Sequence, residues 1–225
     1  MASLGKSALL MVMERVIRSF TGIVVSVSIA RYLGVEQYGQ FSYVTALVGM
    51  FIVFGQFGTD HLLLKDWREA SEQTMGSILT NVFIVRLLGA CLAISVLISY
   101  VYISGDALRK EIFIYALVLL AVGLNVFEPL NLAEQLGSRM SVAQFSVNIL
   151  SSILKLTAVF LEWSLASILI VYLTESLLQS VGNFSVHIAY GQRAFGRVLP
   201  SLSKIRSILL RAFPLVLDGF VVLAY

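Results

Sequence analysis

Six apolar stretches, each long enough to cross a bilayer, occupy most of this 225-residue chain, and a seventh begins near its end. A membrane-crossing helix needs about 20 mostly apolar residues. The predicted spans are Ala8–Tyr32, Phe41–Phe57, Ile78–Ile103, Ile112–Leu132, Ser141–Leu161 and Ser164–Tyr190, with the seventh starting near Ser207. These runs are long and lack the period-two alternation of strands. We therefore expect an all-α integral membrane protein, a six-transmembrane-helix bundle followed by the start of a seventh helix.

The composition excludes several other classes of protein. Hydrophobic residues make up 58% of the chain and charged residues 13%, whereas about a quarter of the residues in soluble domains are charged. The net charge of +3 is too modest to indicate nucleic-acid binding. No zinc-protease, Cys-x-x-Cys, phosphate-loop or nucleophile-elbow motif occurs, and neither His61 nor His187 has a metal-ligand partner at a usable spacing. We expect no enzyme activity, no metal and no cofactor, and coupling to a proton or a sodium ion stays open.

Lysine and arginine residues predict the orientation of the chain in the membrane. With a cytoplasmic N-terminus, the inner segments contain eight of them: Lys6, Lys65, Arg68, Arg139, Arg193, Arg197, Lys204 and Arg206. The outer turns contain only Arg109 and Lys110. Because cytoplasmic loops carry an excess of these residues, we expect the N-terminus to be cytoplasmic. The polar segment His61–Ser77 is then a cytoplasmic connector, either a short amphipathic helix or a solvated loop.

Polar residues recur at helical spacing inside the spans. In the sixth span Glu175, Gln179, Asn183 and His187 follow one another every four residues and so share one helical face. Glu14, Arg15, Arg18, Ser19, Gly22 and Ser26 form a similar stripe in the first span. A long polar face is costly in lipid, so it should meet protein or water. For a single Ser or Asn we favour a packing role between helices, whereas charges deep in a span indicate function or pairing.

Depth along the helices predicts how the buried charges pair. Counting about 1.5 Å per residue, Arg86 can meet Glu128, and Lys155 can meet Glu175. Glu14 and Arg18 are four residues apart on one helix. We hypothesise that at least one of Arg18, Arg86 and Lys155 faces a water-filled cavity and attracts an anionic group. The candidate cavity residues are Arg18, Arg86, Lys155, Glu175, Gln179, Asn183, Asn148 and Glu128.

The first 70 residues contain a distinctive motif. It combines Glu14, Arg15 and Arg18 with the turn Ala30–Gly39, which reads ARYLGVEQYG and contains Arg31, Gly34, Gln37, Tyr38 and Gly39. This motif resembles the N-terminal signature of the polysaccharide flippases, the Wzx-type O-antigen and exopolysaccharide transporters of the MOP superfamily. Val35 stands where the family usually has proline, which loosens the turn without touching the charged positions.

The resemblance implies a transporter of two six-helix lobes around a central cavity. Residues 1–206 would form the N-terminal lobe, and residues 207–225 would open the second, so we expect this chain to be a truncated form that does not transport by itself. The implied activity is the flipping of undecaprenyl-pyrophosphate-linked oligosaccharides across the bacterial cytoplasmic membrane for O-antigen or lipopolysaccharide synthesis. Implied partners are membrane lipids, the lipid-linked oligosaccharide, and polysaccharide polymerase and chain-length proteins. For Arg31, at the outer end of the first span, a role in the interface is favoured over substrate binding.

Two other readings remain open. One is a cation-coupled multidrug antiporter of the same superfamily, which the first-span motif disfavours. The other is a membrane partner of a polysaccharide synthesis complex that does not itself transport. A polymerase or ligase of the same pathway would be expected to carry a large outer loop, and every predicted outer turn here is short.

Overall fold

The computed structural model describes residues 2–191 and 200–224, with the side chains of residues 12–71, 74–191 and 200–214. Every regular element in these ranges is a helix, which confirms the all-α membrane fold. In chain order the helices are α1 (Ala2–Gln56), α2 (Thr59–Glu69), α3 (Glu72–Ser104), α4 (Arg109–Ala116), α5 (Val118–Leu124), α6 (Phe127–Ala133), α7 (Gly137–Phe160), α8 (Leu165–Tyr190) and α9 (Leu202–Ala224).

The first two predicted spans form the two arms of one bent helix, α1. The bend lies at Gly34, whose backbone adopts φ 70° and ψ 178°, a conformation that glycine tolerates best. Five helical segments of the described chain are long and apolar enough to cross a membrane, and the first, Val12–Glu69, has 58 residues. At about 1.5 Å per residue it is roughly 87 Å long, enough for two crossings of a ~30 Å hydrocarbon core. Five segments therefore supply the six predicted crossings of a multi-pass membrane protein.

The fourth predicted span, Ile112–Leu132, is found within the membrane-length segment Arg109–Ala133, but its helix is not continuous. It is divided into α4, α5 and α6, with breaks at Leu117 and Asn125. Pro129 explains the second break. Its nitrogen carries no hydrogen and cannot donate to the carbonyl of Asn125, four residues earlier, and its ring crowds that carbonyl. The chain therefore leaves the helix at Asn125 and starts a new one at Phe127.

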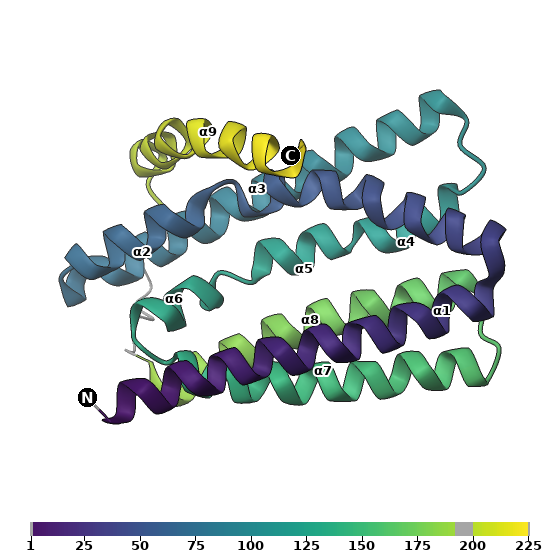
Figure 1. Cartoon of the computed structure of the whole chain (residues 1–225). Coiled ribbons are helices and arrows are strands. Elements are labelled where there is room, and N and C mark those ends of the chain that lie inside the picture. Colours follow the sequence, from purple (N-terminus) through teal and green to yellow (C-terminus); the bar gives the residue numbers. More distant parts are fainter. Residues whose placement is uncertain (1, 192–199, 225) are drawn as a thin grey trace.

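The helices form a layered bundle in which the divided fourth span lies between two groups (Figure 1). The first arm of α1 lies beside α7 and α8, while the returning arm lies beside α3. The larger apolar core joins both arms of α1 to α3, α4 and α8 through buried side chains such as Ile29, Val44, Leu97 and Ile168. A second core lies where α2, α3, α6 and α9 meet, around Leu63, Trp67 and Leu130.

The connector predicted at His61–Ser77 is an amphipathic helix in its first half, α2. This helix buries Leu63 and Trp67 and exposes Lys65 and Arg68. The start of α3 is also earlier than predicted, at Glu72.

The helix predicted to begin near Ser207 is α9, which starts at Leu202. It packs on α1, α2 and α3. Arg211 holds it to Asp66 through two hydrogen bonds of 2.9 and 3.2 Å. The division of the chain at residue 206 into two lobes stays a prediction, and Arg193 and Arg197 lie outside the described residues.

Candidate functional site

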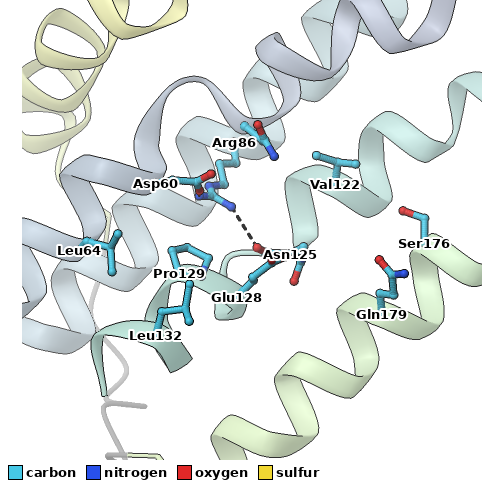
Figure 2. A pocket seen from close by; sticks show the side chains of 11 residues that line it. Asp60, Leu64, Arg86, Val122, Asn125, Glu128, Pro129, Leu132, Ser176 and Gln179 are labelled. Atoms are coloured by element: carbon cyan, nitrogen blue, oxygen red, sulfur yellow. Dashed lines mark hydrogen bonds and ion pairs between the residues drawn. The ribbon is translucent and has the colours of Figure 1, made fainter. Parts of the chain in front are cut away.

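A polar cavity of about 290 Å³ lies between the end of α1, α2, α3, the divided fourth span and α8 (Figure 2). Its lining consists of Gln56, Asp60, Leu64, Arg86, Val122, Asn125, Glu128, Pro129, Leu132, Ser176 and Gln179. Three of the predicted cavity residues, Arg86, Glu128 and Gln179, are among them. The cavity is therefore the place where the structure brings several sequence-predicted residues together.

Arg86 forms one wall of this cavity and is fully committed to protein partners. Its side chain is 1% exposed and pairs with the carboxylate of Asp60. Its Nε donates to Thr59 Oγ1 at 2.7 Å, and a terminal nitrogen donates to the backbone carbonyl of Asn125 at 3.0 Å. That carbonyl is the one that Pro129 leaves without a helical donor. Arg86 thus satisfies the broken backbone of the fourth span, where lipid could not.

The prediction that Arg86 pairs with Glu128 is wrong, because the carboxylate that forms the ion pair with Arg86 is that of Asp60. Asp60 follows the left-handed residues Phe57 and Gly58, which end α1 and turn the chain into α2. Glu128 lies in the same cavity but accepts a hydrogen bond of 2.7 Å from the Asn125 amide. Arg86 is therefore not an open cation, and the hypothesis that it attracts an anionic substrate group is not supported by its contacts.

Lys155 and Glu175 form the ion pair that their depths predict. The Lys155 Nζ lies 2.5 Å from Glu175 Oε2, and the two side chains are 8% and 14% exposed. The Nζ atom also lies 3.8 Å from the centre of the Tyr172 ring, a cation–π contact. Neither residue lines the polar cavity. This pair ties α7 to α8 inside the bundle, so Lys155 too is occupied by partners.

The polar residues that recur every four positions in the sixth span lie in different environments. Gln179 lines the cavity, whereas Asn183 is fully buried. The Asn183 amide donates to Asn125 Oδ1 at 2.9 Å, and its backbone carbonyl accepts from Asn131 at 2.9 Å. Asn148 of α7 is buried and accepts a hydrogen bond of 3.1 Å from Thr21. Asn183 and Asn148 therefore join helices, the packing role that we favour for single polar residues in membranes.

The first arm of α1 keeps a polar face open. Arg15, Arg18, Ser19, Gly22 and Ser26 are all exposed. Within this stripe the only described ion pair is the loose one from Arg18 to Glu14, at 3.8 Å, which was predicted from their spacing. The Arg18 side chain is 43% exposed, while that of Glu14 is 9% exposed against α7. Of the three cations singled out in the sequence, Arg18 is the one that remains open to an external ligand.

The rest of the motif builds the bend of α1. Gly34 provides the positive φ, and Tyr38 stacks on Phe41 with ring centres 6.0 Å apart. Arg31, Gln37 and Gly39 are exposed at the same end of the bundle. These motif residues shape the turn between the first two crossings and do not reach the polar cavity.

One buried polar cluster was not foreseen from the sequence. The Glu134 carboxylate accepts a hydrogen bond of 3.1 Å from the Trp67 indole, and its other oxygen lies 3.6 Å from His187 Nδ1. It joins α2, α8 and the end of the fourth span. The three residues are too far apart in the chain for their spacing to predict the contact. The one indication in the sequence is that His187 lies on the polar face of the sixth span. Among the described residues, no group of three His, Cys, Asp or Glu side chains is placed to hold a metal ion.

Comparison with known proteins gives one match. The family model described as "Polysaccharide biosynthesis protein" matches residues 4–225. No curated protein and no solved structure matches the chain.

Proposed function

Since the chain belongs to the polysaccharide biosynthesis protein family, we propose that it acts in moving lipid-linked oligosaccharides across the bacterial cytoplasmic membrane. The moving substrate would be an oligosaccharide carried on undecaprenyl pyrophosphate, as the Wzx-type motif implies. The chain would lie in this membrane with its N-terminus in the cytoplasm, where Lys65, Arg68, Lys204 and Arg206 carry the positive charge expected of inner segments.

The observation that carries this proposal is the open polar stripe of α1. At about 100° of rotation per residue, Arg15, Arg18, Ser19, Gly22 and Ser26 fall within an arc of roughly 100°. Beside this arc lies a second exposed face, which is apolar: Val16, Phe20, Ile23 and Val27. The apolar face suits lipid, whereas two arginines and two serines do not. The stripe is thus best explained as the wall of an aqueous path beside the first crossing.

The two exposed arginines suit the pyrophosphate end of such a substrate. A guanidinium presents several N–H donors in a plane and binds phosphate oxygens in pairs. Arg86 and Lys155 cannot serve in this way, because each is buried in an ion pair. We therefore assign the anion-binding role to Arg15 and Arg18.

Complementation of a flippase-deficient Gram-negative strain tests the proposal. Surface O-polysaccharide is measured for the parent, R15Q, R18Q and the double variant. R68Q is the matched control, since Arg68 is an exposed arginine of α2. Rescue by the parent and R68Q, with loss in the double variant at equal membrane abundance, is the expected result.

Two results would count against the proposal. Full rescue by the double variant would show that the stripe does not handle the pyrophosphate. Failure of the parent to rescue, in strains that supply several different oligosaccharides, would favour a non-transporting role in the synthesis complex.

A further inference from the structure

The polar cavity between α3, α6 and α8 carries a net negative charge. Its lining contains one cation, Arg86, and two carboxylates, Asp60 and Glu128. Arg86 and Asp60 neutralise each other in an ion pair. Glu128 is the second carboxylate of the lining, and it accepts a hydrogen bond from the uncharged amide of Asn125. An anion entering this cavity would meet a surplus of negative charge, so the cavity is unsuited to phosphate or pyrophosphate.

Several hydrogen-bonding groups face the cavity without protein partners. In the described part of the chain, the side-chain amides of Gln56 and Gln179 and the hydroxyl of Ser176 line the cavity and make no hydrogen bond. Figure 2 shows Gln179 and Ser176 on α8 facing across the cavity toward the fourth span and Arg86. The Asp60 side chain is 40% exposed, so water reaches this wall. Amides and hydroxyls can both donate and accept, and the carboxylates add strong acceptors.

The remaining lining is apolar and comes from Leu64, Val122, Pro129 and Leu132. Ligand pockets typically combine apolar walls with a few placed polar groups and have volumes of roughly 300–1,000 Å³. At about 290 Å³ this cavity is at the small end of that range. It has room for one ring-sized ligand.

From these features we propose that the cavity binds one uncharged sugar ring of the transported oligosaccharide. Ring hydroxyls donate to Glu128 and Asp60 and exchange hydrogen bonds with Gln56, Gln179 and Ser176, while the C–H faces of the ring meet the apolar walls. Acidic sugars are rejected by Glu128. This inference rests on the proposed function, and it separates a sugar-binding cavity from the pyrophosphate-binding stripe of α1.

Protection of an introduced thiol tests the assignment directly. Gln179→Cys is placed in a Cys91→Ser background, because Cys91 is itself exposed. Labelling by a water-soluble maleimide is measured in membranes with N-acetylglucosamine, with glucuronate, with inorganic pyrophosphate and with sodium chloride, each against a sodium-free reference in which choline chloride matches the ionic strength. Ser207→Cys is the matched control, since Ser207 is exposed on α9 away from the cavity.

We expect N-acetylglucosamine to slow labelling at position 179 by at least about threefold near saturation, by simple occupancy. Glucuronate, pyrophosphate and sodium chloride should leave the rate unchanged, and position 207 should respond to none of them. In a Glu128→Gln background glucuronate should also protect, because the repelling charge is gone. This second variant tests the charge rule with the same thiol as the readout.

Four results would overturn the proposal. They are a thiol at position 179 that does not label, labelling that N-acetylglucosamine does not slow, equal protection by glucuronate or pyrophosphate, and protection by sodium chloride alone, which would mark a cation site. Failure of the flippase proposal is distinguishable. Loss of complementation in the arginine variants leaves sugar protection intact, whereas an unprotected thiol in a complementing protein refutes the sugar site alone.

Discussion

Removing Asp60 should destabilise the protein more than removing Arg86, although the two form one ion pair. Their exposure differs sharply, at 40% for the Asp60 side chain and 1% for that of Arg86. Asp60→Ala leaves a buried guanidinium without its counter-charge, and breaking a buried pair in this way costs about 3–5 kcal/mol. Because Glu128 lies in the same cavity, we expect a value near the lower end, about 3 kcal/mol.

Arg86→Met has a smaller expected cost. The exposed Asp60 can take up water when its partner is lost. The main loss is then the donor to the carbonyl of Asn125, which Pro129 cannot replace, and an unsatisfied buried polar group costs about 1–3 kcal/mol. The double variant buries no unpaired charge, so it should resemble Arg86→Met and be about 3 kcal/mol more stable than the sum of the single effects.

The assay is reversible unfolding by SDS titration from mild-detergent micelles, followed by tryptophan fluorescence. The chain has two tryptophans, and Trp67 lies in the neighbouring core. Gln56→Ala, which removes a cavity residue with no described side-chain hydrogen bond, is the control. A larger cost for Arg86→Met than for Asp60→Ala, or strict additivity in the double variant, would refute the reasoning.

Three further outcomes follow from the packing. Gly89→Ala should lower the free energy of unfolding by more than about 2 kcal/mol in the same titration, because its new methyl carbon would lie 2.3 Å from a backbone oxygen of α1. Gly22→Ala is the control, since a methyl group there has no atom within 4 Å, and it should change the free energy of unfolding by less than about 1 kcal/mol. Gly34→Ala should cost about 1–3 kcal/mol through its φ of 70°, measured as a shift of the same midpoint. Lys155→Met should destabilise the protein by about 3–5 kcal/mol, and adding Glu175→Gln should recover much of that loss, whereas no recovery would mean that the pair does not exist in the membrane.

The pair of Lys155 and Glu175 shows what a sequence can predict in a helical membrane protein. The rise per residue of a helix is constant, so counting from each end gives the depth of a side chain. Consecutive spans joined by a short turn are also neighbours in space. Depth and adjacency together were enough to pair these two residues, whose helices α7 and α8 are consecutive.

Arg86 shows where the same reasoning fails. Its depth was consistent with Glu128, but its partner is Asp60, which lies just beyond the predicted end of the second span at Phe57. The sequence does not show that Phe57 and Gly58 adopt positive φ values and interrupt the helix between α1 and α2. Breaks of this kind change both the depth and the direction of every side chain that follows. The break at Asn125 could have been predicted, since Pro129 removes the donor that its carbonyl would need.

The broken fourth span divides the polar side chains of this bundle into two groups: those that hydrogen-bond to carbonyls at helix breaks, and those that make no such contact. Lipid tails offer no donor to a free carbonyl, and in this bundle the carbonyls at the breaks of the fourth span accept from neighbouring helices. Arg86 supplies one for Asn125, and the Ser180 hydroxyl donates to the carbonyl of Ala121 at 2.8 Å. A polar side chain that has this task is not free for a substrate, whatever its charge. Arg18 on the open stripe and Gln179 in the cavity have no such backbone task among the described contacts, which is why the functional assignments rest on the stripe and the cavity rather than on the most deeply buried charges.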